Sequence, residues 1–159
     1  MKILLSSFLV ILIDQITKFW IKTNYLLGSS HDVIGDFFRI TFVENPGVAF
    51  GINVGKYLPI ITILSLFAIG LVSYYLYIER EKRVELRLGL ALILGGAIGN
   101  LIDRLFMLML PGKYTGVVDF IDIGFRDYRW YIFNIADSSV TIGITLVLLY
   151  SLFLTEKTH

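Results

Sequence analysis

The feature that most constrains this chain is a series of four long apolar segments, at residues 3–22, 57–78, 88–110 and 138–154. Each is close to the length of about 20 residues that an α-helix needs to cross the hydrocarbon core of a bilayer. Because lipid offers no partner for backbone N–H and C=O groups, such segments must be helical. The chain is 56% hydrophobic, which is too apolar for an ordinary soluble domain of 159 residues. We therefore expect an all-α membrane protein with four transmembrane helices, forming a single domain over residues 1–159.

The first apolar segment has an alternative interpretation, because residues 3–13 follow Lys2 and resemble the core of a secretory signal peptide. No small-x-small cleavage site follows, and the chain continues through Trp20 to Lys22, which favours a spanning helix.

The orientation follows from the basic residues. Four spans place both termini on one side, together with the link from Glu79 to Arg87, which holds four Lys or Arg in nine residues. The positive-inside rule makes that side cytoplasmic, although Arg39, Lys56, Lys113, Arg126 and Arg129 lie on the other side.

The two outward connections carry strand-like sequence. Residues 33–44 are rich in β-formers and end at a turn, Asn45-Pro46-Gly47; the second connection, 111–137, holds strand-like Val117 to Ile121. The same connection carries aromatic residues suited to the headgroup level: Phe125, Tyr128, Trp130 and Tyr131. A small extracytoplasmic β-rich platform is expected.

Several site types are excluded by composition. There is no cysteine, and the histidines are His31 and His159, so a thiolate nucleophile or a site with several His or Cys metal ligands cannot form within one chain. A net charge of +1 gives no field for nucleic acid. Neither a metal nor a cofactor is expected.

Asp119 and Asp137 lie at the two ends of an aromatic-rich stretch that leads into the last apolar segment. Two carboxylic acids close together at the edge of a bilayer tend to share a proton, so one serves as acid and the other as base in peptide hydrolysis by water. Each has a second interpretation. Asp137 fits a helix start capped by Asn134, and Asp119 fits an exposed, solvated strand position.

Other polar residues are placed in one layer of the membrane, on the outer side. Asp14 lies eight residues before Lys22 and Asp103 seven before Leu110, roughly 10 to 12 Å into the membrane. Asp14 and Lys18 can neutralise each other at i, i+4, and Asn100, Asp103 and Arg104 can form a polar clasp on one helix face. Asp36, Asp122 and Asp127 are interpreted as solvated loop charges.

Three other functions are compatible with these residues. A Ser/Lys hydrolase could use Ser138 or Ser139 with Lys113, and a small proton-coupled transporter could use the buried acids Asp14, Asp103 and Asp137. A carboxylate metal site at Asp119 and Asp122 is the third.

Five motifs together resemble the bacterial lipoprotein signal peptidase family, also called signal peptidase II. In chain order they are D-Q-x-x-K at Asp14 to Lys18, N-x-G-x-A-F at Asn45 to Phe50, G-N-x-x-D-R at Gly99 to Arg104, V-V-D-F at Val117 to Phe120 and F-N-x-A-D-S at Phe133 to Ser138. Their order and spread over four spans make the match specific, although each motif alone is weak.

The resemblance implies an inner-membrane aspartic endopeptidase that cleaves prolipoproteins before a diacylglyceryl-modified cysteine. We expect the protein to act as a monomer, with its site near the outer leaflet. The resemblance makes Asp119 and Asp137 the catalytic pair. The supporting or substrate-binding positions implied are Asp14, Asn45, Gly47, Asn100, Asp103, Arg104, Asn134 and Ala136. Pro46 and Val48 depart from the family's more usual residues and should stiffen the turn.

Overall fold

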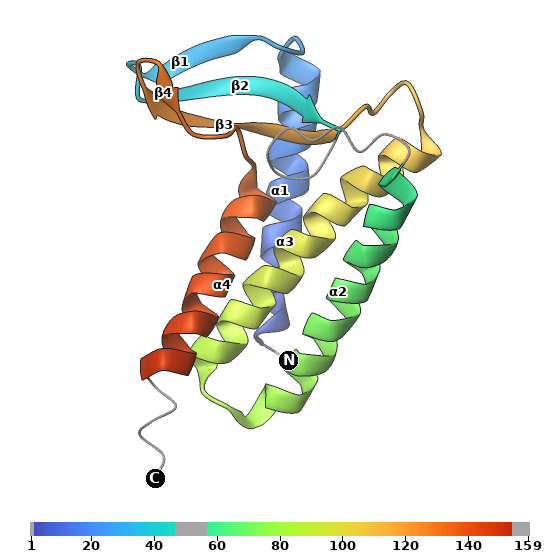
Figure 1. Ribbon diagram of the computed structural model, residues 1–159, viewed down its shortest axis with the longest axis vertical. Helices are drawn as coiled ribbons and strands as arrows, with labels where there is room; N and C mark the ends of the chain where they lie inside the picture. The colour runs from blue at the N-terminus through green and yellow to red at the C-terminus, as the bar shows by residue number, and fades with distance from the viewer. Residues whose placement is uncertain (1, 47–56, 154–159) are drawn as a thin grey trace.

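The computed structural model describes residues 2–46 and 57–153 and contains four long helices and a small sheet (Figure 1). The elements in chain order are α1 (Leu4–Asn24), β1 (Ser30–Ile34), β2 (Phe38–Asn45), α2 (Leu58–Ile78), the short 3₁₀ helix η2 (Glu79–Glu81), α3 (Val84–Met109), β3 (Val117–Phe125), β4 (Tyr128–Arg129) and α4 (Ile135–Phe153). All four α-helices are long and apolar enough to cross a membrane. The expected architecture of four helices with a β-rich platform is confirmed.

Two helices begin earlier than their apolar segments. α3 starts at Val84 rather than at 88, so Glu85 and Arg87 lie in its first turn. α4 starts at Ile135 rather than at 138, directly after Asn134. Charged and polar residues are tolerated in these turns because helix ends project toward the aqueous boundary and leave backbone groups for side chains to satisfy. Hydropathy therefore located both helices but not their first turns.

α3 is the central helix and packs against α1, α2 and α4. Its glycines allow close approach: a Cβ at Gly96 would lie 2.3 Å from the carbonyl oxygen of Ala136 in α4, and one at Gly95 would lie 2.9 Å from that of Ser7 in α1. A Cβ at Gly99 would lie 2.7 Å from the Asp14 carboxylate. Small residues on α3 therefore bring α1 and α4 against the same helix, as small-xxx-small patterns do in membranes.

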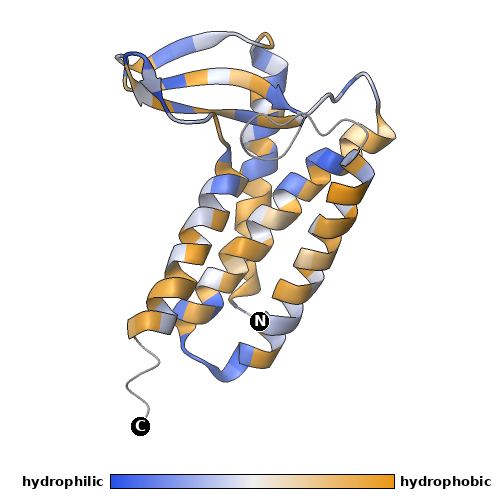
Figure 2. Ribbon diagram, in the orientation of Figure 1, coloured by the Kyte–Doolittle hydropathy of each residue, from blue (hydrophilic) through white to orange (hydrophobic). Residues whose placement is uncertain are grey.

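The sheet lies across the end of the bundle where α1 and α3 finish and where α2 and α4 begin (Figure 1). Its strands are antiparallel in the order β1-β2-β3-β4. A small core of Ile21, Phe42, Val118 and Phe120 fastens the sheet to α1. The polar link around η2 lies at the opposite end of the bundle, together with the start of α1 and the end of α4 (Figure 2).

Asp122 corrects the expectation of a solvated loop charge. It is only 5% exposed, and its carboxylate accepts hydrogen bonds from the Thr41 hydroxyl and from Nε of Arg129, both at 2.7 Å. The reason is that β3 extends to Phe125, so Asp122 lies within the sheet and not in a loop. Asp36 forms ion pairs with Arg39 and Arg129 and is partly exposed, while Asp127 is exposed in the β3–β4 turn.

Candidate active site

Asp119 and Asp137 line the same cavity, which has a volume of about 980 Å³ and lies between the sheet and helices α2, α3 and α4. Asp119 is the third residue of β3, and Asp137 belongs to the first turn of α4. The chain between them runs along β4 and then continues beside β3, where Phe133 exchanges backbone hydrogen bonds with Ile121. This pairing returns the chain to β3 just before α4 begins, which is how two residues 18 positions apart reach one cavity.

Asp119 is buried, with 3% of its surface exposed. Strand alternation directs Val118 and Phe120 into the core with Ile21 and Asp119 into the cavity. The carboxylate accepts a hydrogen bond from Nδ2 of Asn134 at 2.7 Å and one from Nδ2 of Asn45 at 3.3 Å. The solvated alternative for Asp119 is therefore wrong, because the face opposite Val118 is covered. Burial, reinforced by the negative charge of Asp137, raises the pKa of Asp119 to about 7.

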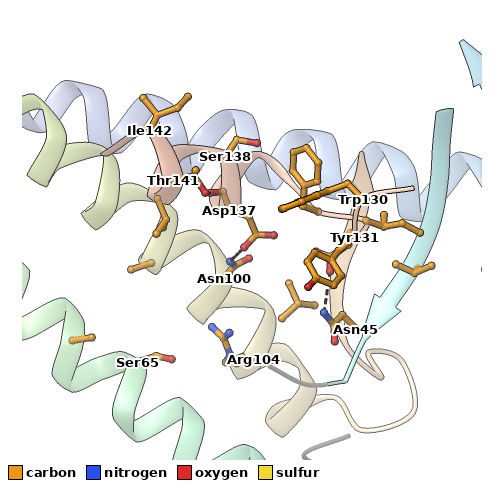
Figure 3. A pocket seen from close by; sticks show the side chains of 18 residues that line it. Asn45, Ser65, Asn100, Arg104, Trp130, Tyr131, Asp137, Ser138, Thr141 and Ile142 are labelled. Carbon is orange, nitrogen blue, oxygen red and sulfur yellow. Dashed lines mark hydrogen bonds between the residues drawn. The ribbon is translucent and has the colours of Figure 1, made fainter. Parts of the chain in front are cut away.

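Asp137 forms a capping box with Asn134 at the start of α4. The Asp137 backbone N–H donates to Oδ1 of Asn134 at 2.9 Å, and the Asn134 N–H donates to Oδ2 of Asp137 at 3.2 Å. The second carboxylate oxygen, Oδ1, accepts a hydrogen bond from Nδ2 of Asn100 at 2.7 Å. Figure 3 shows this contact inside the cavity. The capping interpretation is thus correct for one oxygen of Asp137, while the other oxygen faces Asn100.

Asn134 connects the two aspartates and is fully buried. Its Oδ1 accepts from the Asp137 backbone, and its Nδ2 lies within hydrogen-bonding distance of Oδ1 of Asp119 and, at 3.1 Å, of Oδ1 of Asn100. The Asn134 carboxamide therefore links the carboxylate of Asp119 to the backbone of Asp137, and this contact joins β3 to the start of α4.

A buried ion cluster lies below this layer and corrects the expected polar clasp. Asp103 pairs with Lys18 at 2.9 Å, and Lys18 also pairs with Asp14 at 2.9 Å, so one ammonium serves two carboxylates. The expected Asp14–Lys18 neutralisation is confirmed, but Asp103 joins it from α3. Within residues 2–46 and 57–153, Arg104 has no hydrogen-bonding partner; its charge interacts at longer range with Asp137, Asp103 and Asp119.

The sequence matches the family model for signal peptidase (SPase) II over residues 6–153. The chain belongs to the signal peptidase II family. Proteins named lipoprotein signal peptidase from Syntrophus aciditrophicus and Lactobacillus gasseri are 39% and 41% identical to it; the matches cover 89% and 97% of this chain and 86% and 94% of those proteins. Two solved bacterial membrane enzymes are 36% and 38% identical, with TM-scores of 0.78 and 0.76 over 99% and 97% of this chain and 92% and 94% of theirs. This signal peptidase II family member is therefore a peptidase, and its four apolar helices fit a multi-pass membrane protein.

The structure also places the other expected supporting residues of this signal peptidase II family member, except Gly47. Ala136 donates its backbone N–H to Oδ1 of Asp14 at 2.9 Å, so Asp14 helps to cap α4 from α1. Gly47 lies outside the described residues. Trp130 and Tyr131, expected in a headgroup belt, line the cavity (Figure 3). Neither their position on the cavity wall nor the Lys18–Asp103 contact could be read from spacing, because both depend on how separate elements pack.

The membership in the signal peptidase II family disfavours the rival functions, and the geometry gives them little support. Lys113 is exposed, whereas a lysine base must be desolvated. The Ser138 hydroxyl donates to the Asn134 carbonyl at 2.9 Å. Asp119 and Asp122 have different partners, Asn45 and Asn134 for the first and Thr41 and Arg129 for the second, so they do not form a shared metal site.

Proposed function

We propose that this signal peptidase II family member is an aspartic endopeptidase that removes the signal peptide of prolipoproteins, with Asp119 and Asp137 as its catalytic pair. The observation that carries the proposal is the bridge through Asn134 at the wall of a large cavity. Its Nδ2 donates to the Asp119 carboxylate, and its backbone N–H donates to the Asp137 carboxylate. Two carboxylates in such surroundings divide the roles of acid and base.

The environments of the two acids favour one division of roles. Asp137 lies at a helix N-terminus and accepts hydrogen bonds from a backbone N–H and from Asn100, which stabilise an ionised carboxylate. Asp119 is the acid whose pKa is raised to about 7 by burial and by the charge of Asp137. We therefore assign Asp137 as the base and Asp119 as the acid that keeps its proton.

The reaction then follows a general acid–base course. Asp137 takes a proton from a water molecule, whose oxygen attacks the scissile carbonyl carbon, while Asp119 donates its proton toward the carbonyl oxygen. As the tetrahedral intermediate collapses, the C–N bond breaks and Asp137 passes the proton that it took from water to the leaving nitrogen. The carbonyl re-forms as the proton on its oxygen returns to Asp119. This course requires neither a metal nor a cofactor.

Arg104 fits a substrate-facing role in this scheme. Its guanidinium lines the cavity and has no hydrogen-bonding partner among the residues described, so its donors remain for carbonyl oxygens of a bound peptide. A planar group with several fixed donors suits that purpose.

The cavity also fits a substrate that arrives within the membrane. One wall of the cavity is formed by Ser65 and Ala68 of α2 and by Thr141 and Ile142 of α4. These residues lie within two of the helices that are long and apolar enough to cross a membrane. We propose that the signal peptide and the diacylglyceryl group enter along this wall, so that cleavage occurs just before the modified cysteine. The enzyme is proposed to act as a monomer in contact with membrane lipid.

Purified protein should therefore cleave a diacylglyceryl-modified prolipoprotein and leave the unmodified precursor intact. Mass spectrometry of the products would locate the cut at the peptide bond before the modified cysteine. Addition of a chelator serves as the control for a metal-dependent contaminant and should change nothing. Equal cleavage of both precursors would contradict the lipid requirement, and cleavage elsewhere would contradict the assigned substrate.

We further propose that both termini are cytoplasmic and that the cavity opens near the outer leaflet. In support, the basic link around η2 lies at one end of the four helices, and the sheet that forms part of the cavity wall lies at the other end. The positive-inside rule makes the end with the basic link cytoplasmic. Because the chain contains no cysteine, single-cysteine variants can report this directly. A cysteine replacing Lys82 should react with a membrane-impermeant maleimide only after the cytoplasmic side is opened, and one replacing Lys113 should react in intact cells. The reverse labelling would place the cavity on the cytoplasmic side.

A further inference from the structure

Lys18 has the most unusual environment of any cation in the described part of the chain. It lies inside the bundle on α1, is 3% exposed, and its ammonium contacts Asp14 and Asp103 at 2.9 Å and Oδ1 of Asn100 at 3.0 Å. The three partners use the three donors of a lysine ammonium. Two of these partners are acids. The third is the neutral carboxamide of Asn100, whose Nδ2 donates to Asp137, the proposed base.

The contact with Asn100 determines which way its carboxamide points. Oδ1 of Asn100 accepts from Lys18 and from Asn134, and Nδ2 therefore faces Oδ1 of Asp137 at 2.7 Å. If the carboxamide were rotated by half a turn, its NH₂ would face the ammonium and its carbonyl oxygen would face a carboxylate. Both contacts would be repulsive, so the ammonium allows only the orientation that donates to Asp137.

Asp14 and Asp103 connect Lys18 to the two elements that carry the catalytic pair. Asp14 accepts the Ala136 N–H through its Oδ1, next to Asp137 in the first turn of α4. Asp103 accepts the Val118 N–H at 3.1 Å, next to Asp119 on β3. One ammonium therefore holds groups that are adjacent to both acids.

Lys18 does not itself reach the reaction cavity. It lines a second, smaller cavity of about 160 Å³ with Gln15, Phe19, Lys22, Asp103 and Tyr114, whereas Asn100 and Asp137 line the large one. Lys18 therefore acts on the reaction through its neighbours and through the charge that it exerts on Asp119 at longer range.

We propose that Lys18 is a positioning residue that holds the carboxamide of Asn100 in the orientation that donates to the carboxylate of Asp137, the proposed base. The proposal rests on the catalytic pair assigned above. The charged or titratable groups around that pair are Asp14 and Lys18 on α1, Asp103 and Arg104 on α3, and Tyr131 before α4. Lys18 is the one among them that is placed against the carbonyl end of Asn100.

The test replaces the ammonium while keeping the length and apolar stem of the side chain. Lys18→Met should lower kcat roughly 10- to 100-fold, the loss expected for one charge-assisted hydrogen bond, and should leave KM within about threefold. The acidic limb of the kcat/KM profile should move to higher pH, because a base that has lost its donor is harder to ionise. A residue that only supports the fold would lower the amount of active enzyme without moving the profile.

A second variant covers the case in which Lys18→Met fails to fold with two unpaired acids. Lys18→Met/Asp103→Asn removes one acid along with the ammonium, so the cluster keeps its net charge of −1, now from Asp14 alone. The acidic limb of its kcat/KM profile should move to higher pH by the same amount. Asn100→Ala alone should show this shift too, and adding Asn100→Ala to the charge-balanced variant should shift the limb no further. An unshifted profile, an additive shift, or failure of the charge-balanced variant to fold would overturn the proposal.

The assay separates this proposal from the assignment of the catalytic pair. The parent enzyme and Asp119→Asn are measured on the same lipid-modified precursor in the same pH series. An active Asp119→Asn variant would reject the catalytic pair itself. An inactive Asp119→Asn beside an unshifted charge-balanced variant would reject only the role of Lys18.

Discussion

Asp119→Asn is expected to lower kcat on a lipid-modified prolipoprotein by roughly 10²- to 10⁴-fold, because an amide cannot donate and recover a proton at working pH. Asparagine has nearly the same shape, and its carbonyl oxygen can still accept the 2.7 Å hydrogen bond from Asn134. The variant should therefore insert and fold, and the loss should fall on kcat and not on KM. Purified parent and variant would be compared by initial rates and by thermal unfolding in the same detergent.

The matched control is Asp127→Asn, which makes the same chemical change in the exposed β3–β4 turn. Asp122→Asn would not serve, since Asp122 is buried against Arg129 and its loss would disturb the sheet. Cleavage by Asp119→Asn within about tenfold of the control, well short of the expected acid–base loss, would remove Asp119 from the mechanism.

The raised pKa of Asp119 also determines the sign of the pH dependence. In the proposed mechanism Asp119 must carry its proton to act as the acid, and its pKa is raised to about 7 by burial and by the charge of Asp137. Activity of the parent enzyme should therefore be present below about pH 7 and decline as the pH rises through that value. A rate that keeps rising well above pH 7 would mean that the protonated Asp119 is not the active form.

The helices could be predicted from sequence because crossing a bilayer imposes a length and an apolar composition that few other structures share. The strands were only partly predictable. β3 continues past Ile121 to Phe125, and Gly124 within it pairs with Arg129 across a tight turn. Glycine and charged residues weaken a strand pattern, so the sequence did not show that Asp122 would be buried.

The partners of the buried charges were harder to predict. Spacing along a helix shows that Asp103 and Arg104 lie near one face, but the partner that Asp103 meets depends on the rotation of α3 against α1. That rotation depends on close contacts, such as those of Gly95 with Ser7 and of Gly99 with Asp14. Lys18 therefore pairs with Asp103, and Arg104 remains directed to the cavity.

The two interpretations of Asp137 from sequence, cap and catalyst, prove to be compatible. A carboxylate has two oxygens, and here Oδ2 accepts the Asn134 N–H while Oδ1 accepts from Asn100. The capping contact restricts the rotamer of the side chain, so it orients the oxygen that faces the cavity. A first helical turn is a suitable place for a base, because the helix N-terminus also stabilises its charge.

The capping role and the proposed catalytic role of Asp137 can be separated by a substitution that keeps the cap. Asp137→Glu should preserve the capping box, since glutamate is the preferred acid at this position of a helix, and the thermal stability should stay close to that of the parent. The longer side chain, however, moves the carboxylate relative to Asn100 and Asp119, and a misplacement of this size costs on the order of 10²-fold in rate. Asp137→Asn should lose roughly 10²- to 10⁴-fold, since its amide cannot accept a proton. If the two acids act as one unit, combining Asp137→Asn with Asp119→Asn should be little worse than either change alone. Full activity of Asp137→Glu together with full activity of Asp137→Asn would leave Asp137 with capping as its function.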